Sequence, residues 1–514
     1  MSRPLLRPIV GGSRSGTRLP LPDLLLVAPF IVLFLVQLAH HEMWRDELNA
    51  FSIARASPTL SSLFWHLHYE GHPWLWYFLL WIVTKFTTSL AGMKVLQAII
   101  GISIYLVIGL GSPFSRREKI LLFLCYFISF EYTVVSRMYG VMLLLMLIYI
   151  RQRALYPERI LTGALLLGLM ASTDMMGILL SAPLAVEYAF STWTAEDKAV
   201  DKTRQRPVLA SGIYLGLTAL SIWSLIPAPD ISWRTTEHPF AFAGSFKHLL
   251  QVMVRSIVMP YFPELQPGSF WNAVHTRHSP LLLLAPLVPL FLAAYYVLFR
   301  AHRNLLLIVG LTLLNSIAFG HLIYTGSLHH YAITFLAFLA ALWMLRSKTP
   351  RLSWVAYSFL GLSAIGGLYA GICAWQRPFS NSQATARWLT TNHLDAAPLV
   401  GSPDTSVITV AEMLNRSIYM LDCACTDTYL LFSRRRDSFY RNQIPERLEG
   451  AVRALRVSSF VYLGIGPFSP EEESALLSKG LIAKGPLASF TGAEVDYEDF
   501  YVYRIEAAGR SQIE

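Results

Sequence analysis

The chain contains a series of apolar segments long enough to cross a lipid bilayer, and these segments restrict its fold more than any other feature. A membrane-spanning helix needs about 20 mostly apolar residues. Hydrophobic residues make up 54% of the sequence and charged residues only 15%, whereas soluble domains have about 25% charged residues. Inside lipid every backbone polar group must be bonded within the protein, so the sequence predicts a bundle of α-helices.

About eleven segments meet the requirement for a span. They cover residues 24–40, 93–111, 120–135, 139–150, 160–172, 175–191, 208–226, 280–299, 304–324, 331–345 and 353–374. Basic residues concentrate on the cytoplasmic side of membrane proteins. Arg3 and Arg18 precede the first span, so we expect a cytoplasmic N-terminus and an extracytoplasmic C-terminus.

Residues 73–90 are apolar enough to form one more span, but the basic loops that follow argue against it. If this segment crossed, Arg116, Arg151 and Lys198 would all lie outside, which reverses the positive-inside rule at every loop. Its aromatic residues, Trp74 among them, suit a membrane interface. We therefore predict that residues 73–90 lie along the outer surface of the membrane.

The composition changes near residue 375, where turns and charged residues replace the long apolar runs. We predict a membrane domain over residues 1–375 and a small extracytoplasmic α/β domain over residues 376–514. Within the second domain we expect strands at 460–464 and 500–505, and helices at 383–392 and 445–455.

Other features give little support to several classes of function. The net charge of +9 could indicate nucleic-acid binding, but the basic residues lie between apolar runs, so we predict no nucleic-acid partner. Gly464-Ile465-Gly466 lacks the third glycine and the helix start of a dinucleotide fingerprint, and it predicts a strand followed by a turn. The four cysteines show neither zinc-site spacing nor a disulfide framework.

The ionisable residues of the membrane region gather on the predicted outer side. This side holds Asp46, Glu47, Glu70, His72, Glu131, Arg137, Asp174, Arg255, His329 and His330. Each has a plainer interpretation when taken alone: Asp46 and Glu47 as a helix cap, Arg137 as a headgroup anchor, His330 as a structural residue. Charges at membrane depth are costly and mark functional cavities, so the set together predicts a cavity that opens outward.

Two motifs carry a family resemblance. The acidic pair in Arg45-Asp46-Glu47 and the later segment Tyr69-Glu70-Gly71-His72-Pro73-Trp74-Leu75-Trp76-Tyr77 resemble those of the GT-C glycosyltransferases. The nearest groups are the protein O-mannosyltransferase, aminoarabinose-transferase and rhizobial lipopolysaccharide-transferase lineages. The resemblance extends over about residues 20–345 and is strongest over 41–80. It implies a bacterial inner-membrane enzyme that moves a sugar from a polyprenyl-phosphate donor to an extracytoplasmic lipid, polysaccharide or protein.

The resemblance also implies roles for individual residues. Asp46 becomes the catalytic carboxylate, with Glu47 as the second catalytic candidate. An acceptor hydroxyl must lose a proton as it attacks the anomeric carbon, and one carboxylate base with inversion is the simplest mechanism. The leaving lipid phosphate needs positively charged donors. The candidates for binding the donor and its phosphate are Glu70, His72, Arg137, Arg255 and His330.

The sequence departs from the aminoarabinose transferases at Gly71-His72-Pro73, where those enzymes have a lysine before the proline. Glu70 matches an acidic residue that in some members belongs to a metal or phosphate site, so a divalent metal stays open. Three other functions remain as alternatives: a flippase or transporter for a lipid-linked sugar, an oligosaccharide ligase or polymerase, and a receptor without catalytic activity. We interpret the C-terminal domain as an acceptor-recruiting or lid-like module, with a purely structural role as the alternative.

Overall fold

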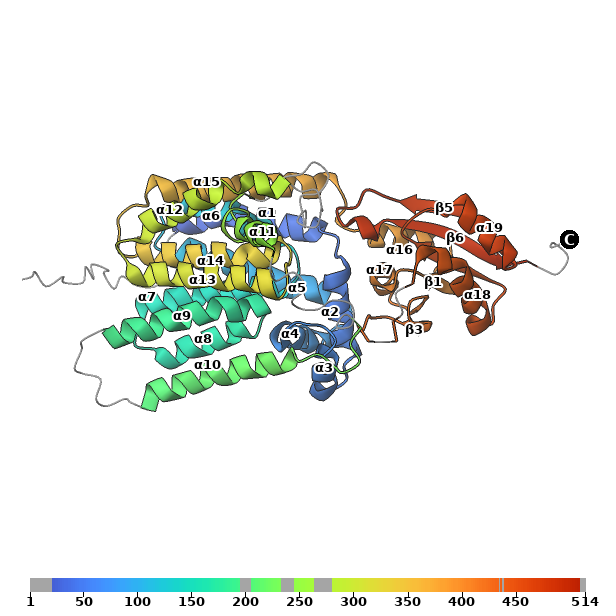
Figure 1. Ribbon diagram of the computed structural model, residues 1–514, viewed down its shortest axis with the longest axis horizontal. Coiled ribbons are helices and arrows are strands. Elements are labelled where there is room, and N and C mark those ends of the chain that lie inside the picture. The colour runs from blue at the N-terminus through green and yellow to red at the C-terminus, as the bar shows by residue number, and fades with distance from the viewer. Residues whose placement is uncertain are drawn as a thin grey trace, which may run out of the picture.

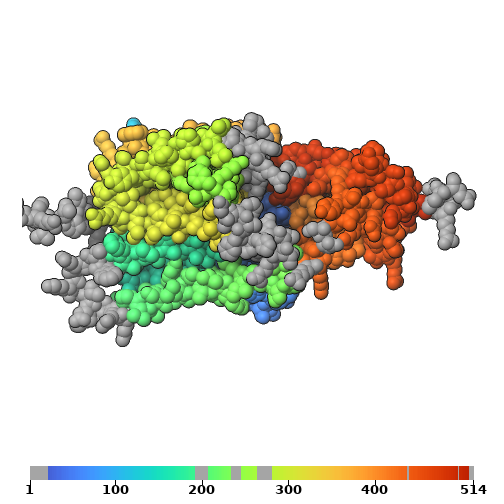
Figure 2. Space-filling view, in the orientation of Figure 1, coloured from blue at the N-terminus to red at the C-terminus, as the bar shows by residue number. Residues whose placement is uncertain are grey.

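The computed structural model consists of a long helical bundle with an α/β domain at one end (Figure 1). It describes residues 21–194, 205–232, 245–262, 280–433, 435–436 and 439–508; Arg3, Arg18 and Lys198 lie outside these ranges. The C-terminal domain, orange to red, directly adjoins the bundle (Figure 2). We call the end of the bundle next to this domain the domain end, and the opposite end the far end.

Helices of 9 to 23 residues, most of them apolar, form the bundle. They are α1 (Leu21–His40), α5 (Ala91–Gly111), α6 (Arg116–Leu124), α7 (Met138–Leu155), α8 (Ile160–Ala171), α9 (Met175–Thr194), α10 (Gln205–Ser224), α12 (Leu287–Phe299), α13 (Arg303–Leu322), α14 (Leu328–Arg346) and α15 (Trp354–Gln376). Among the described residues, seven helices are long and apolar enough to cross a membrane. The chain is therefore an integral membrane protein, and the number of eleven spans stays a prediction.

One predicted span is not a continuous helix. Residues 120–135 include the end of α6, a π-helical turn over Phe127–Glu131, and a short irregular stretch before α7. The break matters because it places the loop that carries Arg137 inside the protein, where Thr133 and Ser136 have no exposed surface. The helix pattern of the sequence did not show this break.

The basic loops share the far end of the bundle. Arg346, at the end of α14, donates from Nε to Glu118 Oε2 of α6 at 3.0 Å. Lys119 Nζ lies 3.5 Å from Asp23 Oδ1, which joins α6 to the start of α1. The predicted topology required these loops to lie on one side, and their arrangement agrees with that requirement.

Three short helices occupy the domain end: α2 (Arg45–Ala56), α3 (Leu60–Leu67) and α4 (Trp74–Thr84). Helix α4 covers most of the segment predicted to lie along the membrane surface. Its 11 residues extend over about 16 Å, whereas the hydrocarbon core of a bilayer is about 30 Å thick. Helix α4 is therefore too short to cross by itself.

The C-terminal domain has the predicted α/β architecture. Its helices are α16 (Ser382–Thr391), α17 (Asp404–Leu414), α18 (Ile444–Leu455) and α19 (Pro470–Ser478), and its strands are β1 (Leu399–Gly401), β2 (Ile418–Met420), β3 (Cys425–Asp427), β4 (Ser459–Gly464), β5 (Leu481–Phe490) and β6 (Phe500–Ala507). The six strands form one sheet in the order β3-β2-β1-β4-β6-β5. Strand β1 is parallel to β2 and β4, and the outer pairings are antiparallel.

Helices cover both faces of this sheet, because alternate residues of a strand point to opposite sides. On β4, Val461 lies in a core with Val407 of α17, and Tyr462 lies in a second core with Leu448 of α18. Helix α17 also packs against α2 of the membrane part. The domain thus contacts the short helices of the domain end through one of its helical layers.

The cysteine expectation was wrong at one place. Cys423 and Cys425 form a disulfide, although only one residue separates them. Such a short spacing does not resemble the framework of a disulfide-stabilised domain, which explains why the sequence argument passed over it. The other two cysteines, Cys125 and Cys373, are free.

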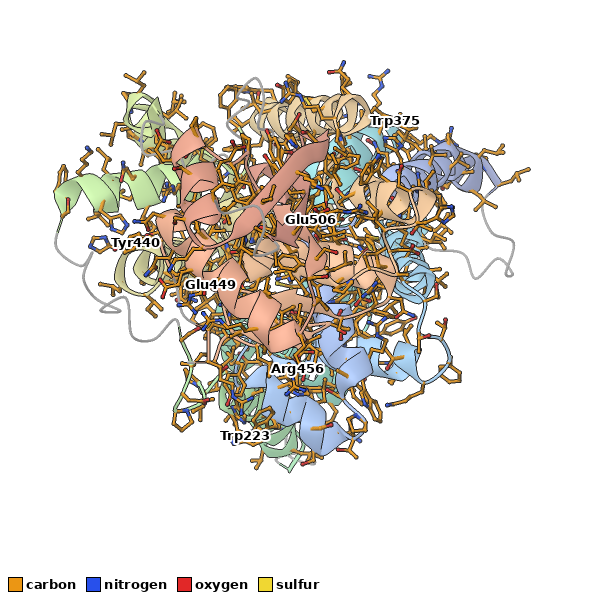
Figure 3. The ribbon with its side chains drawn as sticks, turned by 90° about the vertical axis from the view of Figure 1, so that its right-hand side faces the viewer. Trp223, Trp375, Tyr440, Glu449, Arg456 and Glu506 are labelled. Atoms are coloured by element: carbon orange, nitrogen blue, oxygen red, sulfur yellow. A yellow bond between two sulfur atoms is a disulfide. The ribbon has the colours of Figure 1, made fainter. Side chains whose placement is uncertain are left out.

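Exposed tryptophans mark the domain end of the bundle. Figure 3 looks at the molecule from the C-terminal domain and shows Trp375 and Trp223 at separate edges of the view. Trp375 lies near the end of α15 and Trp223 near the end of α10, and about half of each side chain is exposed. Tryptophans favour the boundary between lipid and water.

Candidate functional site

The site forms around the first turn of α2. Asp46 Oδ1 accepts a hydrogen bond from Arg45 Nε at 2.8 Å, and Asp46 Oδ2 lies 3.7 Å from Arg137 Nη2. The Asp46 side chain is 26% exposed. Asp46 is therefore a carboxylate between two guanidinium groups that a substrate can still reach.

Arg137 is held from two sides. It precedes α7, and its Nη1 donates to the backbone carbonyl of Asp46 at 2.7 Å. Its Nη2 lies 3.1 Å from Nε2 of His72, and Nδ1 of His72 lies 3.2 Å from Oδ2 of Asp174. A guanidinium can only donate, so His72 accepts at Nε2 and carries its proton at Nδ1, toward Asp174. In this arrangement His72 is neutral, and Arg137 supplies the positive charge.

The charges around Asp46 favour its ionised form. Burial opposes ionisation, but the charges of Arg45 and Arg137 outweigh it and lower the pKa of Asp46 to about 2. Burial also opposes ionisation of Asp174, but the hydrogen bond from His72 outweighs it and lowers the pKa of Asp174 to about 2. Both carboxylates are negatively charged at neutral pH.

Glu47, next to Asp46 in sequence, has a different environment. Its side chain has no exposed surface. Oε2 lies 2.9 Å from His41 Nε2 and accepts from the backbone N–H of Trp44, and Oε1 accepts from the backbone N–H of Ser136 at 2.6 Å. Glu47 thus joins the end of α1, the start of α2 and the residue before Arg137.

Glu70 forms a second carboxylate position beside Asp46. Its Oε2 accepts from the Tyr77 hydroxyl at 2.7 Å, and its Oε1 accepts from Asn49 Nδ2 at 3.1 Å. Burial raises the pKa of Glu70 to about 7, although the hydrogen bond from Tyr77 and the charge of Arg137 favour the ionised form. The two carboxylates of the site therefore have pKa values on opposite sides of the usual range, a pattern typical of acid and base groups in enzymes.

His330 lies at the start of α14, and its Nδ1 accepts from the backbone N–H of Ser327 at 2.9 Å. The proton of a neutral His330 is therefore at Nε2. The rings of His329 and His330 are neighbours, with 4.2 Å between their centroids.

Arg255 occupies a different cluster. It is buried near the end of α11 (Phe246–Ile257), next to Tyr331 and close to His248. His248 Nδ1 lies 3.0 Å from His321 Nδ1, and its Nε2 lies 3.0 Å from the Thr325 hydroxyl. The structure thus brings Asp46, Glu70, His72 and Arg137 together and places Arg255 with this pair of histidines.

The described part of the chain contains no group of three His, Cys, Asp or Glu side chains placed to hold a metal ion. Both Glu70 oxygens already have partners, Asn49 and Tyr77.

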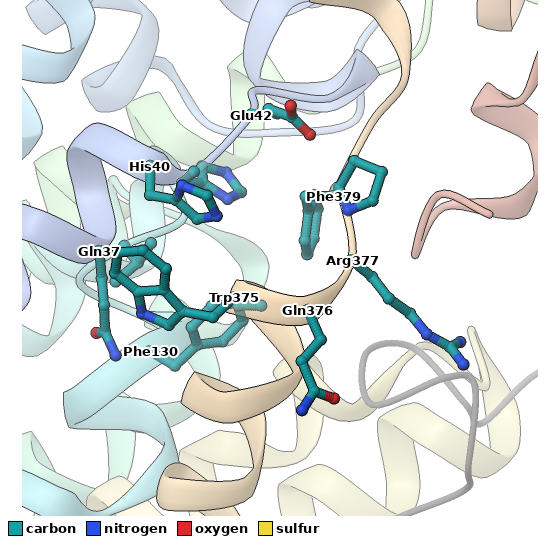
Figure 4. A pocket seen from close by; sticks show the side chains of 12 residues that line it. Gln37, His40, Glu42, Phe130, Trp375, Gln376, Arg377 and Phe379 are labelled. Carbon is teal, nitrogen blue, oxygen red and sulfur yellow. The ribbon is translucent and has the colours of Figure 1, made fainter. Parts of the chain in front are cut away.

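A cavity lies beside the loop that follows α1. This cavity of about 260 Å³ is lined by the end of α1, the loop after it, and residues 374–379. Figure 4 shows His40, Glu42, Trp375 and Phe379 around it. The His40 and Trp375 rings stack with their centroids 4.3 Å apart. The lining consists of these segments with Phe130 and Val134, so the cavity is separate from the space around Asp46.

Sequence reasoning gave no role to three residues that hold the site together. Asp174 was noted only as an acid at the end of a span, yet it anchors His72. Asn49 follows Asp46 by three residues, a helical spacing that could have shown it. Glu498 accepts from the backbone N–H of Arg45 at 2.8 Å across 453 residues, and no local signal exists for such a contact.

No protein-family model and no curated protein sequence matches the chain. Among solved structures, two chains of ArnT from Cupriavidus metallidurans match. The apo structure has a TM-score of 0.53 and 14% sequence identity, over 95% of this chain and 98% of the ArnT chain. The structure of ArnT bound to undecaprenyl phosphate has a TM-score of 0.49 and 15% identity over the same shares. The chain is therefore similar to ArnT in fold, and this likeness includes the C-terminal domain.

Proposed function

We propose that this protein is an integral-membrane glycosyltransferase that moves a sugar from a polyprenyl-phosphate donor to an acceptor hydroxyl outside the cytoplasm. One observation carries the proposal: the reachable carboxylate of Asp46 lies between the guanidinium groups of Arg45 and Arg137. Sugar transfer from a lipid phosphate needs a base for the acceptor and positive charge for the leaving phosphate. The ArnT-like fold and the motifs around Asp46 support the same reaction.

In this mechanism Asp46 removes the proton of the acceptor hydroxyl as its oxygen attacks the anomeric carbon from the face opposite the phosphate. The bond between the anomeric carbon and the phosphate oxygen breaks, and the polyprenyl phosphate leaves with the electron pair. Arg137 stabilises the charge on the leaving phosphate. The donor phosphate competes with Asp46 for Arg137, so donor binding raises the basicity of Asp46 at the step that needs a base.

The second carboxylate gives a second candidate for the base. Glu70 has a pKa of about 7, which is closer to the working pH than that of Asp46 in the donor-free protein. We assign the base to Asp46 because its Oδ2 has only the longer 3.7 Å contact to Arg137, whereas both Glu70 oxygens accept hydrogen bonds. Glu70 then helps to orient the site through Asn49.

We further propose that the domain end faces away from the cytoplasm, in the cytoplasmic membrane of a bacterium. Basic loops at the far end support this orientation. A transporter would place its polar groups near the middle of the membrane, and the charges around Asp46 gather at one end instead. An oligosaccharide ligase shares the donor chemistry and differs in its acceptor.

Asp46→Asn tests the proposal, with Asp23→Asn as the matched control. Asp23 is an aspartate with similar side-chain exposure, 27%, and it also lies near basic side chains, but at the far end. We expect Asp46→Asn to lower transfer of radiolabelled sugar by about 100- to 10,000-fold, the usual effect of removing a general base, while Asp23→Asn keeps normal transfer. Normal transfer by a folded Asp46→Asn protein would reject Asp46 as the base.

A further inference from the structure

Helix α2 is polar in sequence but buried in the structure. Residues Glu47 to Ala54 are all buried. A helix buried on every side needs partners on every side. The bundle supplies one side through Arg137 and Ser136, and the C-terminal domain supplies the other.

The C-terminal domain contacts the first turn of α2 through Glu498. Its Oε1 accepts from the backbone N–H of Arg45 at 2.8 Å, and the Glu498 residue has no exposed surface. The first N–H groups of a helix have no partner within the helix, and Trp44 provides no side-chain cap. Glu498 therefore satisfies a backbone group one residue before Asp46. The neighbouring Tyr497 ring lies under the Arg45 guanidinium, with 5.3 Å between ring centroid and Cζ.

A second contact lies one turn further along α2. Leu430 donates from its backbone N–H to Asn49 Oδ1 at 2.8 Å, and Asn49 Nδ2 lies 3.3 Å from the Leu430 carbonyl oxygen. The same Asn49 amide donates to Glu70. Asn49 thus links the backbone of Leu430, in the C-terminal domain, to Glu70, the second carboxylate of the site.

A third contact lies at the other end of the helix. Glu412 of α17 accepts from the Ser52 hydroxyl at 2.5 Å and from Arg55 Nη2 at 2.6 Å. Arg45 and Arg55 are ten residues apart, which corresponds to about 15 Å along a helix. Glu498 and Glu412 are both buried, so the interface has two comparable carboxylates, one beside Asp46 and one remote from it.

We propose that the C-terminal domain is a working part of the catalytic site, and that Glu498 is a positioning residue that holds Asp46 in place against Arg137. This inference rests on the proposed function. It differs from the acceptor-recruiting or lid-like role expected from the sequence, because the contacts reach the helix that carries the catalytic carboxylate. Small displacements of a catalytic group have large effects on rate. The contact of Glu498 with Arg45, the residue before Asp46, should therefore affect kcat.

The full-length protein tests this inference with Glu498→Ala, Glu498→Gln and Glu412→Ala. Burial raises the pKa of Glu498 to about 8, so glutamine imitates the group at neutral pH and keeps an oxygen for Arg45 N–H. We expect kcat to fall by about 10- to 100-fold in Glu498→Ala, with little change in KM for the donor. We expect kcat of Glu498→Gln and of Glu412→Ala to stay within about threefold of kcat of the unchanged protein. All rates are normalised to folded protein in the membrane.

A purely structural interface predicts another result. In that case Glu498→Ala and Glu412→Ala would reduce kcat equally and in proportion to lost thermal stability, and equal effects would overturn the inference. If Glu498→Ala does not fold, Glu498→Asp decides, because it shortens the side chain by one methylene: lower kcat than in Glu498→Gln supports positioning, and equal kcat rejects it.

Asp46→Asn, measured in the same assay, separates the two proposals. Normal transfer in that variant would reject the proposed function. Lost transfer in that variant, together with equal effects of the two alanine variants, would reject only the role of Glu498.

Discussion

The two sides of the first turn of α2 show how differently adjacent carboxylates can be placed. On one side the Asp46 side chain is 26% exposed and lies between two arginines. On the other side Glu47 is fully buried, and two backbone N–H groups and a histidine occupy its oxygens. The exposed Asp46 suits proton transfer, and the buried Glu47 fixes the position of the turn that carries Asp46. An acidic pair in sequence is therefore not a pair in function.

Arg137→Ala should have the largest effect among the variants that sharpen this comparison. It removes the positive charge beside Asp46 and the donor to the Asp46 carbonyl. We expect kcat/KM for the donor to fall by about 100- to 1,000-fold, as for other groups that stabilise developing charge. Steady-state transfer assays with purified polyprenyl-phosphate sugar measure this kcat/KM.

Arg346→Ala serves as the matched control, since it also breaks an arginine–carboxylate pair, that with Glu118, but at the far end. A loss in Arg346→Ala as large as in Arg137→Ala would mean that both variants act through the fold.

Glu47→Gln should affect stability more than chemistry. Glutamine cannot accept at both ends, so one backbone N–H, that of Trp44 or of Ser136, loses its buried partner. An unpaired buried group costs about 1–3 kcal/mol, which should appear as a lower Tm. Transfer per folded molecule should fall much less than in Asp46→Asn. If Glu47→Gln removes transfer while Tm is unchanged, the two sides of the turn have been assigned the wrong way round.

The pH dependence should show the smallest effect and still distinguish Asp46 from Glu70. The base must be ionised, and kcat/KM reports the pKa of the free protein. With a pKa of about 2, Asp46 is ionised throughout pH 5–8, so kcat/KM should be flat there. If Glu70 were the base, kcat/KM would fall as the pH drops below about 7, and Glu70→Gln would abolish transfer.

The sequence was a good guide where one element's own pattern decides its structure. Short β-rich runs predicted β4 and β6, whereas the placement of residues 73–90 along the membrane surface stays a prediction. Together with the family resemblance the sequence also selected Asp46, Glu70, His72 and Arg137, which the fold brings together. These residues stand out because charge is rare in apolar surroundings.

The contacts between distant segments could not be predicted from the sequence. Arg137 and Asp46 meet across 91 residues because the predicted span before Arg137 breaks into a π-helical turn. Glu498 is one of many acids in a soluble-looking domain, and only the folded chain brings it to α2. Glu47 and Asp46 are adjacent acidic residues in the sequence, and only the burial of Glu47 in the folded chain distinguishes them.

The contact between Arg45 and Glu498 also has a consequence for biosynthesis. The two residues are 453 positions apart, and chains grow at about 5–20 residues per second. The start of α2 therefore leaves the ribosome roughly 20–90 s before its partner has been made. During this time α2 lacks the partners that the C-terminal domain supplies to Arg45, to Asn49 and to Ser52. The contact that completes the first turn of α2 therefore forms only after almost the whole chain has been made.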